Sequence, residues 1–239
     1  MRKLSFIGLL GLVALTACQP TQQTSPANPK APTIKAVTKK APNGRMTVTD
    51  YKVVVSRVAP HALAACKQLR ADKNCSFQYH VHPNPKAPSN AFQSLDKKGR
   101  PMVTVTRSFL KSARNRDELA FVIGHETAHH LRAHIDQQQR SAMTGMILGG
   151  ILGAAIGVDA QGVETAMRVG GTVGARQFSK THEIQADELG AVIATRAGYN
   201  ALNGVKYFEK VPDPGNRFLG THPPNAHRVQ AVHRVMGVK

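Results

Sequence analysis

Tryptophan is absent from this sequence of 239 residues, and aromatic residues make up only 5% of it. Acidic residues are also scarce, because 14 Asp and Glu stand against 32 Lys and Arg, which gives a formal net charge of +18. Such an excess is often found in nucleic-acid-binding proteins. Since the sequence contains no stacking-aromatic motif and no zinc-finger spacing, we do not expect nucleic acid as a partner. An anionic membrane surface or acidic proteins are the expected counterparts of this charge.

Cysteine is rare as well, and the first of three cysteines follows a segment typical of export. Residues 1–17 have a basic start and a mostly apolar run from Leu4 to Ala14, which is too short to span a membrane. We therefore expect a signal peptide, which also argues against nucleic acid. Leu-Thr-Ala before Cys18 resembles the lipobox of bacterial lipoproteins, in which the cysteine is acylated and becomes the mature N-terminus. The alternative is an ordinary signal peptide with a coincidental cysteine.

The residue after Cys18 is Gln19, whereas an Asp there usually retains bacterial lipoproteins at the inner membrane. By this sorting rule we expect a Gram-negative lipoprotein anchored through Cys18 on the periplasmic side of the outer membrane. Residues 18–45 are rich in Pro, Thr, Gln and Lys, so we expect them to form a disordered tether. Residues 46–239 are then long enough for one domain with its own core.

The other two cysteines, Cys66 and Cys75, are an even pair in a chain that we expect to be exported. Because the periplasm is oxidising, such a pair favours a disulfide. Closing so short a loop should stabilise the fold by roughly 2–3 kcal/mol. The alternative, a pair of metal-binding thiolates, lacks further cysteines to complete a site.

Hydrophobic periodicity predicts a mainly α-helical domain with a small β-sheet, an α+β fold. The helices are expected at 50–69, with Pro60 as a kink or boundary, at 117–136, at 182–198 and at the C-terminus. Short strands are expected at 76–82 and 100–106, with a loop between them.

Residues 145–158, GMILGGILGAAIGV, are all apolar or small but too few to cross a bilayer. Glycine recurs every four residues, a spacing that lets another backbone approach closely. The interpretation that the sequence favours is a helix buried beside the core of the domain. Membrane dipping and hairpin packing against residues 163–176 are the alternatives, and self-association through the glycines is a further hypothesis.

Four of the eleven histidines lie close together, and two of them form the pattern His125-Glu126-x-x-His129. On a helix, residues four apart share a face, so both imidazoles can bind one zinc ion. Glu126 then lies beside the metal, where its carboxylate can take a proton from water. His130 and His134 do not share that face and are expected to be solvated.

A third ligand is needed, and its position decides the class of zinc site. A third histidine ten residues after the first is excluded, because Ile135 occupies that position. An acidic residue on a later helix is the other route, and Glu183 with Asp187 one turn further offers it. Glu183 can complete a His, His, Glu set that leaves a fourth position for water, while Asp187 can accept the free N–H of a ligand histidine. The alternative is a solvated acidic helix start.

Together these motifs resemble the gluzincin metallopeptidases of the HtpX and CAAX-prenyl-endopeptidase type. Besides HExxH, the resemblance rests on Asn90-Ala91-Phe92 before a strand, the segment 102–110, Glu183-x-x-x-Asp187, and His222-Pro223 with Arg228 six residues on. The integral-membrane members have long spanning helices, which this sequence lacks after its signal, and QSLDKKGR replaces the Gly-rich segment that usually follows the Asn-Ala-Phe element. The sequence is therefore more similar to the lipid-anchored periplasmic branch.

The resemblance implies a zincin-like metallopeptidase domain with an HExxH helix and a second helix that carries a glutamate. One zinc ion would be held by His125, His129 and Glu183. Glu126 would act as the general base and later as the proton donor.

For the other residues, the resemblance implies supporting roles. His222 would either donate to the oxyanion or act as an inhibitory fourth ligand, and both roles stay open. Arg228 would orient Asp187 or a ligand carboxylate. Asn90 would hold the substrate backbone near an edge strand.

We therefore expect a zinc endopeptidase that hydrolyses periplasmic or outer-membrane proteins, and the resemblance implies a role in envelope quality control. One alternative is a non-catalytic, zinc-containing lipoprotein that acts as a chaperone or an outer-membrane assembly factor. The intact Glu126 favours the enzyme, because a structural zinc site needs no base. A basic structural protein adsorbed on a membrane is a third possibility, and the oligomeric state is open.

Overall fold

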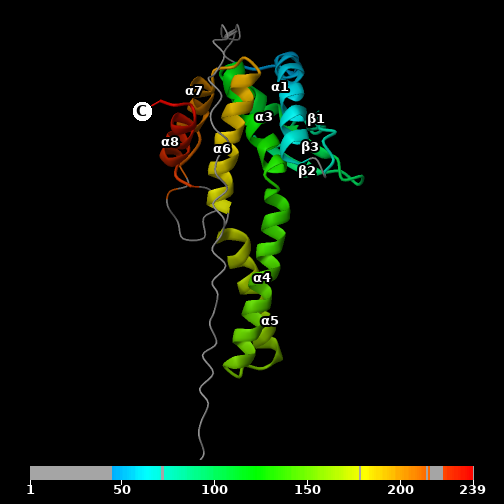
Figure 1. Cartoon of the computed structure of the whole chain (residues 1–239), viewed down its shortest axis with the longest axis vertical. Coiled ribbons are helices and arrows are strands. Elements are labelled where there is room, and N and C mark those ends of the chain that lie inside the picture. Colours follow the sequence, from blue (N-terminus) through cyan, green and yellow to red (C-terminus); the bar gives the residue numbers. More distant parts are fainter. Residues whose placement is uncertain (1–44, 71–72, 178, 214, 216–222, 239) are drawn as a thin grey trace, which may run out of the picture. The chain divides into compact units, whose positions relative to one another are not determined.

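The computed structural model describes residues 45–70, 73–177, 179–213, 215 and 223–238. The chain divides into two units, Met1–Ala31 and Pro32–Lys239, and every described residue belongs to the second. Within the described residues, helices predominate and three short strands form one sheet, which confirms the expected fold class (Figure 1). The predicted signal peptide, Cys18, nearly all of the predicted tether and His222 lie outside the described residues.

The sheet consists of β1 (Gln78–Val81), β2 (Ala91–Leu95) and β3 (Pro101–Val105), in the order β1-β3-β2. β1 is parallel to β3, and β2 is antiparallel to it. The strands expected at 76–82 and 100–106 are confirmed, whereas β2 lies in the segment expected as a loop. Ala-Phe-Gln-Ser-Leu shows no alternation that would mark a strand, and it becomes one through its pairing with β3.

Helix α1 (Val48–Leu69) begins at a capping box formed by Thr47 and Asp50. The Asp50 amide donates to the Thr47 hydroxyl, and the Thr47 amide donates to the Asp50 carboxylate. The helix continues through Pro60, where a kink or a boundary was expected. Because Pro60 is exposed, the carbonyl that loses its helical partner at this turn can bond to water.

Helix α3 (Arg116–Leu131) follows the short α2 (Arg107–Ser112) and forms the middle of the core. Its first turn is capped by Asn115, whose side chain accepts a hydrogen bond from the Glu118 amide. Apolar side chains on several sides of α3 are fully buried, because α1, α6, α7 and the sheet all contact this helix. The metal-binding pattern therefore lies on the most enclosed helix of the domain.

The helix expected at 117–136 is interrupted after Leu131. Ala133 has a φ of 58°, in the left-handed region that favours glycine, and α4 (His134–Ala155) begins at the next residue. This turn brings His134 back toward the last turn of α3, where its ring contacts His129.

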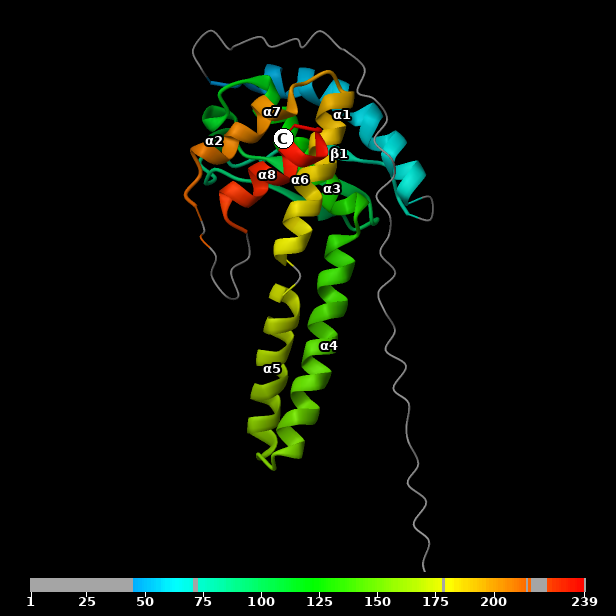
Figure 2. The same cartoon turned by 60° about the vertical axis from the view of Figure 1, so that its left-hand side comes forward.

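Helices α4 and α5 (Ala160–Gln177) pack against each other as a hairpin that projects from the rest of this unit (Figure 1, Figure 2). A Cβ atom on Gly145 would overlap the carbonyl oxygen of Gly170, and one on Gly170 would overlap the Gly145 carbonyl. The glycines therefore form the contact between the two backbones, which confirms hairpin packing as the correct alternative.

The favoured expectation that residues 145–158 form a buried helix is wrong, since Ile151 is 59% and Leu152 is 65% exposed. An apolar sequence alone cannot show whether another layer of the protein covers it. Within the described residues, no helix combines the length and apolarity needed to cross a bilayer.

Helix α6 (Ser179–Arg196) follows the hairpin, packs along α3 and is terminated at Gly198, whose φ is 87°. The chain continues through α7 (Ala201–Gly204) and the 3-10 helix η1 (Val205–Glu209). Helix α8 (Asn225–Val235) packs on α6. The helices expected at 182–198 and near the C-terminus are confirmed.

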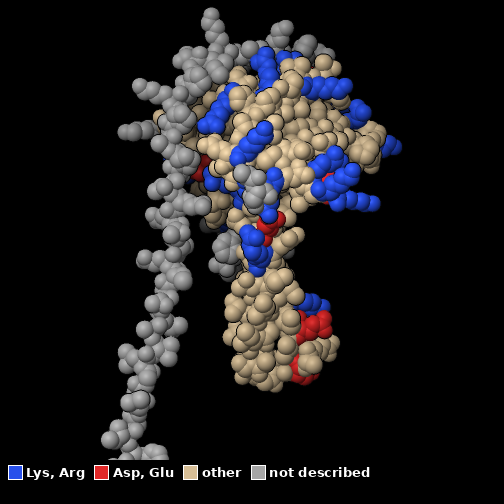
Figure 3. Space-filling model, turned by 45° about the vertical axis from the view of Figure 1, so that its right-hand side comes forward, with Lys and Arg blue, Asp and Glu red and all other residues tan. Residues whose placement is uncertain are grey.

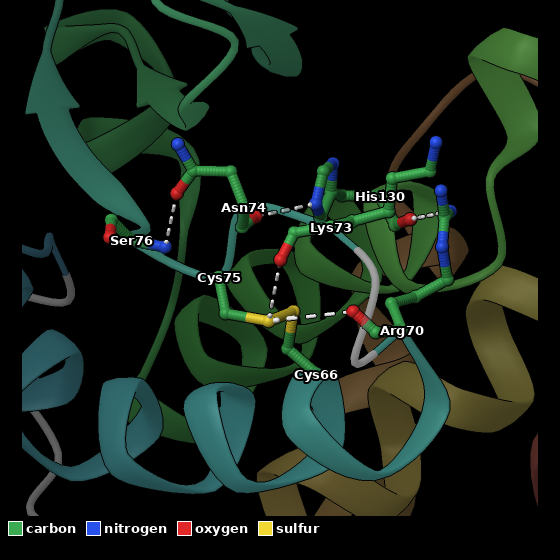
Figure 4. Close-up of a disulfide and its surroundings, with 7 residues drawn as sticks. All are labelled: Cys66, Arg70, Lys73, Asn74, Cys75, Ser76 and His130. Carbon is green, nitrogen blue, oxygen red and sulfur yellow. Dashed lines mark hydrogen bonds between the residues drawn. A yellow bond between two sulfur atoms is a disulfide. The ribbon is translucent and has the colours of Figure 1, made fainter.

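The expected disulfide joins Cys66 near the end of α1 to Cys75 in the loop before β1, with Cα atoms 5.7 Å apart (Figure 4). The same loop is tied to α3, because His130 Nε2 lies 3.1 Å from the carbonyl oxygen of Asn74. Arg70 donates to the His130 carbonyl at 3.1 Å. The expectation that His130 is solvated is therefore wrong, since its ring is half-buried and anchors the disulfide loop.

Candidate active site

Two glycines set the distance between the helices that carry the candidate ligands. A Cβ atom on Gly124 of α3 would lie 2.6 Å from the carbonyl oxygen of Gly190 on α6. A Cβ atom on Gly190 would lie 2.6 Å from the His125 nitrogen and 2.8 Å from its Cα. The helix backbones are thus in contact beside His125, which allows the short acidic side chains of α6 to reach the histidines.

Three side chains from these helices converge at this contact. His125 and His129 of α3 place their Nε2 atoms 3.0 Å apart. The carboxylate oxygens of Glu183 on α6 lie 3.6 Å from His125 Nε2 and 3.3 Å from His129 Nε2. One donor atom from each residue lies within 4.8 Å of the others, so the three form a candidate metal site. The structure brings together the three expected ligands, whose role as ligands stays a prediction.

Asp187 contacts the Nδ1 atom of His125, and Arg228 pairs with Asp187. Arg228 of α8 forms a two-point ion pair with the fully buried Asp187, at 2.7 and 2.9 Å, and contacts Glu183 at 3.2 Å. His125 Nδ1 lies 2.9 Å from Asp187 Oδ1. Burial by itself disfavours a charged imidazole, but the hydrogen bond to Asp187 and the negative charges of Asp187 and Glu183 together outweigh it and raise the pKa of His125. Since Nδ1–H donates to Asp187, Nε2 keeps its lone pair for the metal site.

His134 contacts the Nδ1 atom of His129, as Asp187 contacts that of His125. The two Nδ1 atoms lie 3.0 Å apart, and His134 Nε2 lies 3.0 Å from Gln185 Oε1. Because an amide oxygen only accepts, His134 Nε2 carries the proton and its Nδ1 accepts from Nδ1–H of His129. His129 Nε2, like His125 Nε2, then directs its lone pair toward the cluster. Burial keeps His134 neutral by lowering its pKa to about 3, which agrees with this arrangement.

The expectation that His134 is solvated is therefore wrong, because its side chain is only 3% exposed. His182 of α6 stacks on it with ring centroids 4.3 Å apart and an interplanar angle of 11°. His182 Nε2 in turn lies 3.1 Å from Gln137 Oε1 of α4. These contacts join the start of α4 to the start of α6 at the metal cluster.

The donor set fits a divalent metal ion. In the neutral tautomers that Asp187 and His134 favour, two imidazole lone pairs face each other at 3.0 Å beside a carboxylate. Without a cation, that arrangement would leave three electron-rich atoms in mutual repulsion. Two histidines and one glutamate are a frequent ligand set of catalytic zinc.

Glu126 lies next to the cluster at the wall of a small cavity. The cavity has a volume of about 220 Å³ and is lined by Glu126, His129, Glu183 and His134, and by Phe92 and Gln93 of β2. Burial raises the pKa of Glu126, although the nearby histidines oppose the shift. A carboxyl group with a raised pKa beside a candidate metal site is suited to general acid–base chemistry.

Strand β2 forms one side of this cavity and is an edge strand of the described sheet. Asn90 immediately precedes it, with an exposed side chain and a backbone fixed at Thr106 by hydrogen bonds of 3.0 and 2.9 Å. Asn90 is not among the residues that line the cavity, whereas Phe92 and Gln93 are. Phe92 belongs to the Asn90-Ala91-Phe92 element on which the family resemblance rests, whereas Gln93 was not predicted, because β2 was not expected as a strand.

Comparison with known proteins agrees with this geometry. Residues 52–236 match the model of peptidase family M48, which covers most of the chain. The chain belongs to peptidase family M48. The resemblance to metallopeptidases of the HtpX and CAAX-prenyl-endopeptidase type is confirmed, and the family indicates a metalloprotease that acts on peptides or proteins.

Two members of known name share part of the chain. The mitochondrial metalloendopeptidase OMA1 of Saccharomyces cerevisiae is 29% identical over 171 residues, which cover 66% of this chain and 46% of that protein. A protein of Vibrio cholerae named as a beta-barrel assembly-enhancing protease is 29% identical over 119 residues, which cover 47% of this chain and 24% of that protein. The aligned region thus spans less than half the length of either relative.

Proposed function

We propose that this M48 protein is a zinc-dependent endopeptidase. The observation that carries the proposal is the convergence of two imidazole lone pairs and the Glu183 carboxylate beside Glu126. The tautomers of both histidines are set by buried partners that contact their Nδ1 atoms, opposite the Nε2 atoms of the cluster. Such outer contacts orient metal ligands in zinc enzymes.

A bound zinc ion would supply Lewis-acid chemistry for the scissile carbonyl. Glu126 takes a proton from the attacking water and delivers it to the leaving amine, a role that its raised pKa supports. Strand β2 offers its edge to an extended peptide, so that the substrate enters as an added strand and its side chains meet Phe92 and Gln93. Asn90 at the start of β2 would hold the substrate backbone, and His222 would donate to the oxyanion or bind the metal.

We infer that the substrates are periplasmic or outer-membrane proteins and that the enzyme serves envelope quality control. The export-type N-terminus with Cys18, the cysteine pair that forms a disulfide and the name of the Vibrio cholerae relative support this inference. Acylation at Cys18 would anchor the protein on the periplasmic side of the outer membrane of a Gram-negative bacterium.

The decisive variant is Glu126→Gln, which preserves the volume of the side chain and removes the base. We expect cleavage of casein or of an unfolded outer-membrane protein to fall by roughly 10²–10⁴-fold, since general acid–base catalysis contributes about that factor. Bound zinc, measured by elemental analysis, should be retained. The matched control is Glu188→Gln on α6, which removes a surface ion pair with Arg234 and should leave cleavage unchanged.

The alternative of a non-catalytic zinc lipoprotein predicts a different result. Wild type and Glu126→Gln would then suppress the aggregation of an unfolded outer-membrane protein equally, and neither would cleave it. Equal residual cleavage by the two proteins would refute the peptidase proposal, and purified protein without bound metal would refute the zinc site.

A further inference from the structure

The outer surface of the α4–α5 hairpin is apolar over most of its area. Among the described residues, nine of the thirteen exposed large hydrophobic side chains lie between residues 143 and 169. Ile156 reaches 76% exposure. Figure 3 shows the hairpin as a largely uncharged projection, while Lys and Arg side chains are spread over the visible face of the rest of the unit. A contiguous exposed apolar patch of this kind usually marks a binding surface.

The packing of the hairpin explains why its large side chains face outward. Gly145 and Gly149 of α4 contact the backbone of Gly170 and Ala166 on α5, and any Cβ atom on these two α4 glycines would overlap a carbonyl oxygen. Small residues thus fill the space between the helices, and leucine and isoleucine are left outside. In water the opposite arrangement stabilises a hairpin, whereas small residues inside and large ones outside are typical of helices packed in lipid.

The exposed apolar side chains of α4 also cover more of its circumference than a groove in a protein partner would bury. With 3.6 residues per turn, the exposed ones cover about 240° of the helix circumference. In order around the helix they are Met146, Met143, Ile147, Ile151, Leu148 and Leu152. A helix bound in a groove buries one stripe about 100° wide. Contact over a much larger arc fits a fluid phase of acyl chains.

The polar side chains of α4 lie within residues 134–144, and from residue 145 onward those of the two hairpin helices lie on α5. Five exposed polar or charged residues lie on one face of that helix, namely Gln161, Glu164, Thr165, Arg168 and Thr172. Residues 141–158 contain no charged residue. The helical part of that stretch, 141–155, is about 22 Å long, which is shorter than the hydrocarbon core of about 30 Å. The apolar stretch is therefore too short to cross the bilayer, and the hairpin can lie within one leaflet.

The charge of the domain favours an anionic surface. Residues 1–44 contain six basic and no acidic residues, so residues 45–239 carry 18 − 6 = +12. Basic residues near a membrane surface each contribute about 1 kcal/mol of attraction to anionic lipids. Gly145, Gly149 and Gly153 already contact α5 within the hairpin, so the hypothesis that the glycines drive self-association is not supported.

We propose that the α4–α5 hairpin inserts into one leaflet of an anionic membrane, with α4 in contact with the acyl chains and the polar face of α5 toward the headgroups. Since α4 begins at His134 beside the metal cluster, the site stands about 25 Å from the inserted Ile151. The peptidase site would thus be held close to the membrane surface. This proposal does not depend on peptidase activity.

The absence of tryptophan provides a clean test in the full chain. A single tryptophan is introduced at Ile151 on α4, at Thr172 on the polar face of α5, or at Leu63 on α1, which is 40% exposed. Each variant is reconstituted into phosphatidylcholine–phosphatidylglycerol vesicles whose acyl chains are either plain or brominated. The ratio of the tryptophan emission in brominated vesicles to that in plain vesicles reports contact with acyl chains at that position. It does not depend on how the N-terminus is attached to the vesicle.

We expect bromination to reduce the emission of Ile151→Trp by roughly twofold or more, because an interfacial helix buries its apolar face about 5–10 Å deep. Thr172→Trp should be quenched less and Leu63→Trp hardly at all. Quenching of Ile151→Trp should weaken in vesicles of phosphatidylcholine alone. Absence of quenching at Ile151, or equal quenching at all three positions, would overturn the proposal. A lipid-independent blue shift that increases with protein concentration would instead identify a second copy of the chain as the occupant.

Discussion

The α3–α6 pair and the α4–α5 pair both bring two helix backbones into contact through glycine, and they differ in what surrounds that contact. At Gly124 and Gly190 the contact is enclosed by α1, α8 and the sheet, and buried charges are paired beside it. At Gly145 and Gly170 no described element covers the outer faces of the hairpin. Glycine sets the distance between the two helices in both pairs. The neighbouring elements make the difference, because they enclose the candidate metal site beside α3 and α6 and leave the outer surface of α4 and α5 uncovered.

The largest expected effect on stability concerns the buried ion pair between Asp187 and Arg228, which lies beside the α3–α6 contact and has no counterpart in the described part of the hairpin. Arg228→Ala would remove the ion pair of Asp187, which has no exposed surface, and leave its buried charge with only the hydrogen bond from His125. We expect the free energy of unfolding to fall by about 3–5 kcal/mol in urea denaturation. The matched control is Arg168→Ala on α5, where the exposed guanidinium bonds only to Thr165 among the contacts shown, and the change should stay within about 0.5 kcal/mol. Equal losses in the two variants would contradict the comparison.

The two glycine contacts can be broken separately. Gly190→Ala would push α6 away from His125, so we expect a loss of about 1–3 kcal/mol in unfolding free energy and weaker zinc binding in competition with a chelator. Gly170→Ala would separate α4 from α5 within the hairpin and should leave zinc affinity unchanged. If Gly170→Ala weakened zinc binding as much as Gly190→Ala, the hairpin and the metal site would not be independent.

Alkaline pH should destabilise the body of the domain and spare the hairpin. Burial raises the pKa of Tyr79 in β1 to about 12, so the folded state favours the neutral phenol. The resulting stability is complete below pH 10, the pKa of an unfolded tyrosine, and is lost as the pH rises toward 12. Residues 134–177 contain no Tyr, Lys or Cys that would ionise in this window.

Tyr79→Phe cannot ionise and serves as the comparison for that pH dependence. We expect the wild type to lose up to about 2 kcal/mol more than Tyr79→Phe between pH 10 and 12, measured by urea denaturation at each pH. Parallel curves for the two proteins would show that ionisation of Tyr79 does not control alkaline stability.

The smallest expected effect is at Ala133, the joint between the two regions. Its φ of 58° costs an alanine about 1 kcal/mol, which glycine would not incur. The greater freedom of glycine in the unfolded chain offsets part of that gain. Ala133→Gly should therefore raise the melting temperature slightly, and a large decrease would show that the backbone at this turn is not strained.

Local patterns in the sequence determined much of the metal site. The spacing of His125 and His129, the apolar helical context around them and the absence of a third histidine at position 135 pointed to Glu183, and the structure brings these three residues together. Helix periodicity also predicted α3, α6 and α8, because each buries a continuous apolar face. The cysteine pair predicted the disulfide.

Only the tertiary structure determined the contacts of His134, the formation of strand β2 and the exposure of residues 145–158. His134 became the partner of His129 because Ala133 turns left-handed, a conformation that the residue type does not predict. Strand β2 formed because β3 pairs with it, although its own residues do not alternate. The sequence could show that residues 145–158 are apolar and closely packed, but burial depends on which other elements lie over a surface, and none of the described elements lies over the face of α4 opposite α5.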